Sequence, residues 1–415
     1  MISELKIRNF KSLESVDLKL GHFNLLVGAN ASGKSNFLDA LRFLQGVGNG
    51  FTLNEILDGK PPSSTNAKWD GIRGGSKFVS FRKQDGTQSE SNQIHVTFDD
   101  IGITYYGLDK LTYGLTWAVK DGVISISSEI LKSDSGNILM DEMTPYLVPL
   151  PDEEFDVSSN LDVSFDSPLR VVSIYDAWPR VTFWSHSEYP SEMVARCARF
   201  VSSELADMQL LDLLPAMLRD YSSKVARLGE LGEGFAALIH HIETNGSKPA
   251  LLEWLKELRP DEVSDLFAIP GAVNDYMAAI KEGNTVFPAP TISEGTLRFI
   301  ALAAAFFQPS MPKVLVIEEI ENGLHPSRLR LLLELMRSQS KRTGTQVFAT
   351  THSPTLLAWL TEEDRKTTFV CTRDADSGAT KMRSLAEIPR FEELIEEGSH
   401  IDELFAEGWL ESAPQ

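Results

Sequence analysis

The eight residues from position 28 to position 35 constrain the fold of this chain more than any other feature. They read Gly-Ala-Asn-Ala-Ser-Gly-Lys-Ser and fit the pattern GxxxxGK[ST] without a mismatch. In that pattern, backbone N–H groups and the first turn of a helix surround phosphate groups. Residues 22–27 predict a short buried strand before the loop, and residues 36–44 predict a helix with one apolar face after it. This order of strand, loop and helix indicates an α/β core that binds a nucleotide.

Individual residues of the loop have predictable roles. Lys34 is expected to add positive charge at the β- and γ-phosphates of ATP, and the Ser35 hydroxyl is expected to bind Mg²⁺. The glycines allow the backbone to wrap closely around the phosphates. The predicted nucleotide-binding residues are Gly28, Asn30, Gly33, Lys34, Ser35 and Asn36.

Composition limits the class of protein. With 415 residues and 42% hydrophobic content, the chain can bury a large core and is expected to form two or three subdomains. No apolar run approaches the roughly 20 residues that span a bilayer, and the N-terminus lacks the apolar region of a signal peptide. Cys197 and Cys371 are isolated from each other in the sequence. These features predict a reduced, cytoplasmic protein with no membrane segment.

Net charge bears on the partners. The chain carries 39 Lys and Arg against 59 Asp and Glu, a formal net charge of −20. This balance argues against a broad basic surface for nucleic acid, although DNA could still bind through a local basic patch.

The distribution of strand-like and helix-like sequence along the chain predicts five parts. We expect an N-terminal part of the core with the P-loop at residues 1–60 and a C-terminal part at residues 291–385. Between them, residues 61–176 are β-rich and predict an antiparallel sheet, with short strands at 78–81, 94–98, 103–106 and 123–127. A mainly helical insertion is expected at residues 177–290, with helical sequence from 191 to 260. Residues 386–415 form an acidic helical tail.

The C-terminal part of the core contains a second group of candidate residues. Residues 291–298 open an apolar helix, where Ser293 either caps the helix or, with the Gly295 backbone, directs its N-terminus at a phosphate. The apolar run at residues 314–317 predicts a central parallel strand, and it ends in Glu318 and Glu319. Glu318 would hold Mg²⁺ through water and Glu319 would polarise the attacking water. Alternatively, the two carboxylates begin a solvated loop.

A further strand at residues 345–350 leads to His352. A histidine at the end of a strand is often a structural hydrogen-bonding group. Because this strand follows the carboxylate strand by one helix, His352 is also a candidate catalytic residue that senses the terminal phosphate.

Four segments together resemble the ABC-type ATPase heads of the SMC, RecF and OLD (overcoming-lysogenization-defect) families. They are GANASGKSN at 28–36, ISEGTLR at 292–298, VIEEIENGLHP at 316–326 and ATTHSP at 349–354. The resemblance implies that Ser293 and Gly295 belong to the signature motif, residues 322–325 to the D-loop, and that His352 is the switch histidine. It also implies that two heads sandwich two ATP molecules, each signature completing the partner's site.

The sequence departs from the family pattern in two places. Glu318 stands where most ABC proteins carry Asp, a replacement common in OLD-like sequences. The Q-loop glutamine is not assigned, since Gln84, Gln88 and Gln93 all lie in a plausible region.

Two related functions are disfavoured. Transporter ATPases keep the P-loop and the signature closer together, whereas this chain inserts residues 61–290 between them. OLD-type nucleases add a Toprim domain with an acidic metal site. Asp374 and Asp376 fit such a pair superficially, but only 39 residues follow them and a hairpin turn is the better interpretation. We therefore expect an ATP-driven switch or scaffold that works with a separately encoded nuclease or toxin in anti-phage defence. DNA repair of the RecF type is the alternative.

The acidic tail leaves two alternatives open. Apolar residues recur at helical spacing in residues 391–397 and 401–405, among carboxylates. This face either packs on the protein's own core or docks a partner.

Overall fold

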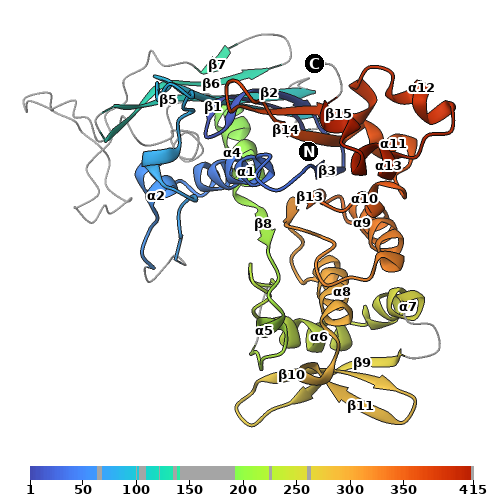
Figure 1. The fold of residues 1–415 in the computed structure, drawn as a ribbon. Helices are drawn as coiled ribbons and strands as arrows, with labels where there is room; N and C mark the ends of the chain where they lie inside the picture. Colours follow the sequence, from blue (N-terminus) through green and yellow to red (C-terminus); the bar gives the residue numbers. More distant parts are fainter. Residues whose placement is uncertain are drawn as a thin grey trace, which may run out of the picture.

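The structure is a computed structural model that describes residues 1–62, 68–99, 101, 109–120, 122–133, 138–140, 192–223, 227–258 and 263–412. Three sheets organise these residues (Figure 1). An antiparallel sheet lies at the top of the view, a mostly parallel sheet lies in the middle, and a small antiparallel sheet lies at the bottom. The predicted α/β fold with a P-loop core and an antiparallel β part is confirmed.

The central sheet has the strand order β15-β14-β3-β13-β12-β8, and only β15 runs antiparallel to its neighbour. Its strands are β3 (Phe23–Val27), β8 (Met208–Leu211), β12 (Val314–Ile317), β13 (Gln346–Thr351), β14 (Thr368–Arg373) and β15 (Thr380–Ser384). Every residue of β3, β12 and β13 is buried. These strands are buried throughout because helices or a second sheet cover both faces of the parallel sheet, and β12 reads as an unbroken apolar run.

The two faces of the central sheet belong to different cores. On β12, Val314 and Val316 join the upper core, while Leu315 and Ile317 join the lower one. Above the sheet lie α1 (Lys34–Gly48) and α4 (Glu192–Ala206), and below it lie α8 (Glu294–Ala304) and α9 (Leu329–Thr343) (Figure 1). The period-2 alternation of the strand therefore places each second residue in a separate layer.

The antiparallel sheet covers α1 and α4 and has the order β2-β1-β4-β5-β6-β7. Its strands are β1 (Ile2–Phe10), β2 (Leu13–Lys19), β4 (Asn92–Asp99), β5 (Lys110–Lys120), β6 (Val123–Ser133) and β7 (Ile138–Met140). Between sheet and helix, the fully buried rings of Phe43 on α1 and Trp117 on β5 stack with centroids 4.4 Å apart. Aromatic stacking of this kind fixes how the P-loop helix sits under the sheet.

The β-rich prediction was partly right. The strands predicted at 94–98 and 123–127 fall within β4 and β6, and the one at 103–106 lies outside the described residues. The strand predicted at 78–81 was wrong. Gly74 and Gly75 turn the chain with positive φ just before it, a short 3-10 helix η1 (Ser76–Phe78) follows, and Ser80 makes only an isolated bridge to Phe10.

The helical prediction for residues 177–290 needs two corrections. Residues 208–211 form β8, because they pair in parallel with β12 at the edge of the central sheet. Residues 263–288 form the small sheet β11-β10-β9, with β9 (Val263–Pro270), β10 (Tyr276–Glu282) and β11 (Thr285–Pro288). The two-residue turn Gly283-Asn284 that joins β10 to β11 is a hairpin signal, and Gly283 has the positive φ of 56° that such turns need.

The helices α5 (Pro215–Leu218), α6 (Phe235–Thr244) and α7 (Lys248–Leu258) pack between this sheet and α8. We call α5–α7 and β9–β11 together the lower lobe (Figure 1). The ring of His240 on α6 stacks on Tyr276 of β10 with centroids 4.0 Å apart, which ties helix to sheet. Whether the five predicted parts behave as separate units stays a prediction.

The C-terminal tail packs on the protein's own core. After α10 (Pro354–Leu357), α11 (Glu362–Lys366) and the β14–β15 hairpin come α12 (Phe391–Glu396), α13 (Ile401–Ala406) and α14 (Trp409–Ser412). The buried apolar residues of these helices are Phe391, Ile401, Leu404 and Leu410, and α13 packs against α10. The idea that this face docks a partner was therefore wrong.

Across the ranges given above, no helix combines the length and apolar character that a membrane crossing requires.

We predict that the tail contributes to stability. Replacing Phe391, which is fully buried, by alanine should lower the free energy of unfolding by about 3–5 kcal/mol, since a large cavity opens in the core. Phe405→Ala removes the same ring from a partly buried position on α13 and should cost less. Urea unfolding followed by tryptophan fluorescence measures both, and equal losses would contradict the assignment.

Candidate nucleotide-binding site

The P-loop joins the end of β3 to the start of α1 and is held from above by the β14–β15 hairpin. A Cβ atom at Gly28 would lie 2.3 Å from the carbonyl oxygen of Cys371. At Gly33, which has a φ of 106°, it would lie 1.9 Å from Oγ1 of Thr380. Close contacts therefore require glycine at both positions, and at Gly33 the positive φ requires it as well.

The side chain of Lys34 closes the loop. Its Nζ is buried and donates hydrogen bonds to the carbonyl oxygens of Gly28 and Ala29, at 2.6 and 2.9 Å. Asn30 and Ser35 are exposed, with Ser35 in the first turn of α1. The loop thus wraps an ammonium group, and Asn30 and Ser35 face outward around it.

Asn36 supports the loop from behind. Its side-chain amide donates to Ser12 Oγ at 2.6 Å, and Ser12 Oγ lies 2.6 Å from Thr380 Oγ1. Thr380 Oγ1 in turn donates to the Ser32 carbonyl oxygen at 3.0 Å. In this structure the Asn36 side chain braces the P-loop, a contact that the sequence pattern does not show.

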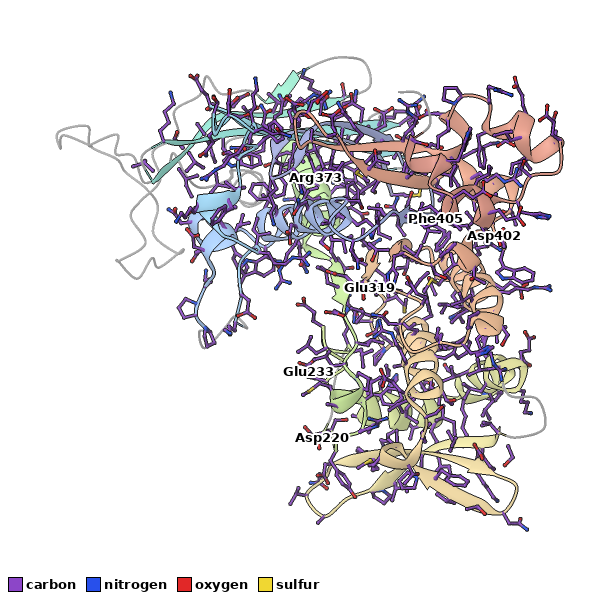
Figure 2. The ribbon with its side chains drawn as sticks, in the orientation of Figure 1. Asp220, Glu233, Glu319, Arg373, Asp402 and Phe405 are labelled. Carbon is purple, nitrogen blue, oxygen red and sulfur yellow. The ribbon has the colours of Figure 1, made fainter. Side chains whose placement is uncertain are left out.

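Parallel pairing brings the other candidate residues to the same edge of the sheet. β13 pairs with β3 on one side and with β12 on the other, with Thr351 opposite Val27 and Ala349 opposite Ile317. Glu318, Glu319 and His352 follow the ends of β12 and β13, beside the start of the P-loop. Figure 2 shows Glu319 at the level where the central sheet meets the lower lobe.

The Glu318 carboxylate is partly buried, and its side chain is 24% exposed. Burial raises the pKa of Glu318, while the nearby Arg73 guanidinium opposes that shift. A carboxylate with little solvent around it favours a cation beside it. This environment suits the predicted magnesium role better than the alternative of a solvated loop.

Arg73 is a residue that the sequence patterns did not identify. Its Nη2 lies 2.9 Å from the Ser35 carbonyl oxygen and 3.5 Å from Glu318 Oε1. One cationic group thus reaches both the first turn of α1 and the carboxylate that follows β12. The Ser35 hydroxyl on the exposed first turn of α1 and the Glu318 carboxylate are oxygen donors of the kind that Mg²⁺ prefers, so these two residue types fit Mg²⁺.

Glu319 adopts a strained backbone conformation. Its φ is 46°, in the left-handed region that residues other than glycine rarely adopt. Its N–H donates to Thr350 Oγ1 at 2.9 Å, and its carboxylate accepts a short hydrogen bond from the Asn322 side chain. Such strain costs about 1–3 kcal/mol and is typical of functional sites, where the surroundings hold it in place.

Arg298 connects the signature helix to this pair of carboxylates. It is buried on α8 and donates to the carbonyl oxygens of Leu213, Glu318 and Glu319, at 2.6, 3.1 and 3.1 Å. Burial lowers the pKa of Arg298, and surrounding carboxylates oppose the shift. The sequence offered one signal for this contact, because Arg298 is a charged residue between apolar neighbours in this helix.

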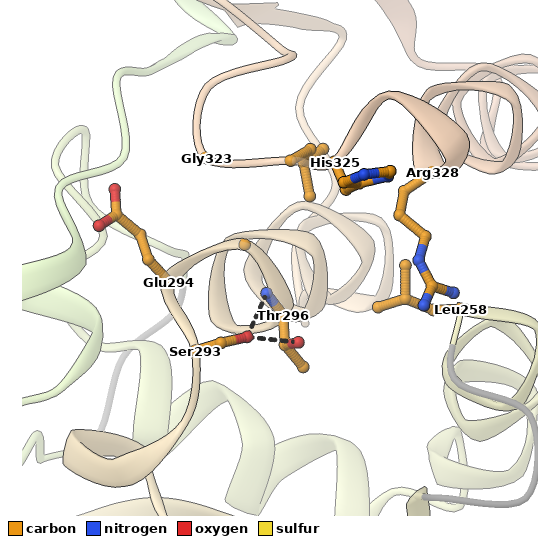
Figure 3. Close-up of a pocket in the computed structure, with 9 residues that line it drawn as sticks. Leu258, Ser293, Glu294, Thr296, Gly323, His325 and Arg328 are labelled. Carbon is orange, nitrogen blue, oxygen red and sulfur yellow. Dashed lines mark hydrogen bonds between the residues drawn. The ribbon is translucent and has the colours of Figure 1, made fainter.

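The signature residues lie in a separate pocket of about 540 Å³ (Figure 3). Ser293 caps α8: its Oγ accepts from the Thr296 N–H at 3.4 Å and lies 2.8 Å from Thr296 Oγ1. A Cβ at Gly295 would lie 2.2 Å from the Gly323 carbonyl oxygen, so the D-loop crosses directly over the helix. The lining includes Ser293, Glu294, Gly295, Gly323, His325 and Arg328. None of residues 28–36 is among it.

His352 is oriented by Glu321, another residue that the motifs did not single out. The Glu321 side chain is 9% exposed, and one of its carboxylate oxygens accepts a hydrogen bond from the backbone N–H of His352 at 2.7 Å. The same oxygen lies 3.1 Å from His352 Nδ1. The histidine side chain is 43% exposed and leaves Nε2 for other contacts.

The glutamines proposed for the Q-loop are engaged elsewhere. Gln84 donates to the Ala375 carbonyl oxygen and Gln93 to Thr116 Oγ1, and Gln88 forms an isolated bridge with Arg82. The Q-loop residue stays unassigned. At the β14–β15 hairpin, Asp374 accepts from the N–H groups of Asp376 and Ser377, so the predicted hairpin turn is confirmed.

Comparison with known proteins adds the family. Residues 23–106 and 57–358 match the sequence profile of a family described as "AAA domain, putative AbiEii toxin, Type IV TA system". The chain belongs to this family.

Two relatives and one solved structure are similar to this chain. An "ATP/GTP phosphatase" of Helicobacter pylori (strain ATCC 700392 / 26695) is 24% identical over 376 residues, covering 89% of this chain and 90% of that protein. The "Endonuclease GajA" of Bacillus cereus (strain VD045) is 23% identical over 380 residues, covering 86% of this chain and 56% of that protein. The fold is also similar to that of a solved SMC head bound to the C-winged helix domain of ScpA, with a TM-score of 0.52 at 14% identity. That match covers 92% of this chain and 98% of the solved one. The chain is an ABC-type ATPase with the fold of an SMC head.

We predict that Glu321 positions the switch histidine. Glu321→Gln keeps an acceptor for the backbone N–H but removes the charge that holds the imidazole. By analogy with other orienting partners, the turnover number should fall about 10- to 100-fold. The KM for ATP should change much less, because Glu321 has no predicted contact with the nucleotide. Steady-state kinetics separate the two, with Glu363→Gln, an exposed carboxylate on α11, as the control. A change confined to KM would contradict the positioning role.

Proposed function

We propose that the protein is a cytoplasmic, Mg²⁺-dependent ATPase in which ATP joins two heads and hydrolysis separates them. The observation that carries this proposal is the division of the site between two surfaces. The P-loop, Glu318, Glu319 and His352 share one edge of the sheet, whereas the Ser293–Gly295 pocket has a separate lining. A second copy of the chain could supply the missing signature to each P-loop.

The residues support the following division of roles in hydrolysis. Lys34 would pair with the β- and γ-phosphates and His352 would contact the terminal phosphate. Glu319, held by Asn322 and Thr350, would orient and polarise the attacking water. Mg²⁺, held by Ser35 and by Glu318, would supply positive charge at the phosphates when bound.

We further propose that the ATPase acts as a switch for a separately encoded effector in anti-phage defence. Support comes from the toxin named in the family description and from the similarity to an endonuclease. The described residues contain no group of acidic, histidine or cysteine side chains that could hold a metal ion on their own. DNA repair of the RecF type remains the alternative. Identifying the protein that co-purifies from the native host distinguishes the two.

Contact with DNA belongs to this proposal as well. His95 on β4 is partly buried, which lowers its pKa, and the cations of Lys132, Lys6 and Arg8 lower it further. Basic groups thus gather on the outer face of the antiparallel sheet. Arg8 also pairs with Asp17 and Lys6 with Glu4, so carboxylates neutralise part of this basic patch.

The first prediction concerns the chemistry. Lys34→Ala removes the ammonium group at the phosphates and should abolish ATP hydrolysis while the protein stays folded. Phosphate release and circular dichroism measure the two properties. Lys341→Ala, which removes an exposed lysine on α9, should hydrolyse ATP normally. A normal rate of ATP hydrolysis in Lys34→Ala would contradict the P-loop assignment.

The second prediction concerns assembly. Glu319→Gln keeps the shape of the side chain but removes its basicity, so ATP should bind and remain. Light scattering should then show an ATP-dependent dimer or larger assembly. Adding Ser293→Arg, which fills the signature pocket, should prevent that assembly. A monomer with and without ATP would count against the sandwich.

A further inference from the structure

Arg73 lies between the P-loop helix and the predicted magnesium carboxylate. Its guanidinium makes three contacts there: with the Ser35 carbonyl oxygen, with Glu318 Oε1, and with Asp39 Oδ1 at 3.2 Å. Its side chain is 53% exposed, so solvent reaches it from the open side of the site. None of the four family segments contains this residue.

The loop around Arg73 holds it at this position. Asp39 on α1 has a side chain only 4% exposed and pairs with both Arg73 and Lys11. Lys11 Nζ also donates to the Arg73 carbonyl oxygen at 2.9 Å, which fixes the backbone. Gly71, Gly74 and Gly75 take positive φ on either side of it. The chain thus turns tightly around the arginine and delivers its side chain to the site.

We propose that Arg73 is an internal competitor of Mg²⁺. In the arrangement seen here its guanidinium neutralises Glu318, and loading of Mg²⁺ requires it to give up that carboxylate. The inference rests on the proposed function, because Ser35 and Glu318 are the predicted magnesium residues.

Electrostatics supports competition. A guanidinium in contact with Glu318 and a divalent cation held by the same carboxylate repel each other at short range. The Arg73 and Glu318 side chains are 3.5 Å apart, and the Arg73 side chain is about half exposed, so water replaces the contact when the guanidinium moves away and the pair breaks at small cost. Asp39 keeps Lys11 as a partner when Arg73 moves, and no buried charge is left alone.

If Arg73 had a different role, its removal would change Mg²⁺ binding in the opposite direction. If Arg73 served to orient Glu318 for the metal, its removal would weaken Mg²⁺ binding. Competition predicts that removal strengthens it. The direction in which the affinity for Mg²⁺ changes in Arg73→Ala therefore distinguishes the two roles.

The experiment is a titration of the full chain with Mg²⁺ in the presence of a fluorescent ADP, which binds without turnover. Arg73→Ala should lower the Mg²⁺ concentration for half-maximal binding by about fivefold, the upper range for an exposed ion pair. Arg73→Lys, which keeps the charge beside Asp39 but loses the forked geometry, should give a smaller shift in the same direction. If the alanine variant does not fold, the lysine variant still decides the sign.

Arg82→Ala is the matched control. Arg82 follows Arg73 on the same segment and donates to the Lys77 carbonyl oxygen, without a contact to Glu318. The Arg82→Ala substitution also removes one positive charge, and it should leave the Mg²⁺ concentration for half-maximal binding unchanged. A midpoint that is unchanged or raised in Arg73→Ala, or lowered equally in Arg82→Ala, would overturn the proposal.

These outcomes differ from a failure of the proposed function. If the wild type binds the fluorescent ADP and Lys34→Ala does not, the nucleotide site stands, whatever Arg73 does. If the wild type binds no nucleotide at any Mg²⁺ concentration, the proposed function itself fails.

Discussion

Parallel pairing of β13 with β3 and β12 is the interaction on which the site depends. Parallel strands end at the same edge of a sheet, so this pairing brings the P-loop after Val27, the carboxylates after Ile317 and His352 into one place. In the sequence the P-loop lies nearly 300 residues before the carboxylates and more than 300 residues before His352. The strands are buried on both faces, and the resulting apolar packing fixes their register. The residues at the edge are therefore positioned by strands that are buried throughout.

Close backbone contacts then shape the two binding surfaces. The β14–β15 hairpin reaches over the P-loop so tightly that Gly28 and Gly33 have no room for a side chain. At the signature, Gly295 lies directly under the Gly323 carbonyl oxygen. Substitutions in the hairpin or the D-loop would therefore be felt at the phosphate-binding surfaces without touching a nucleotide.

Charged side chains connect these surfaces to one another. Arg298 ties the signature helix to the backbone of both carboxylates, and Glu321 ties the D-loop segment to His352. Arg73 ties the P-loop helix to Glu318. Together with the strained backbone at Glu319, these links connect the carboxylates at the sheet edge with the P-loop helix, with α8 and with His352.

The sequence by itself determined the local features: the P-loop with its strand and helix, the apolar strand ending in Glu318 and Glu319, the position of His352, and the family. These follow from patterns within about 20 neighbouring residues, where backbone geometry and apolar spacing are encoded directly. Only the tertiary structure decided that residues 208–211 form a strand, since a short apolar run suits helix and strand alike until β12 pairs with it. The same holds for the acidic tail, whose apolar face could equally have met a partner but packs against α10. Arg73 and Glu321 came to light in the same way. Their roles rest on contacts with residues far away in the chain or on another element, and such contacts leave no periodic trace around the residue itself.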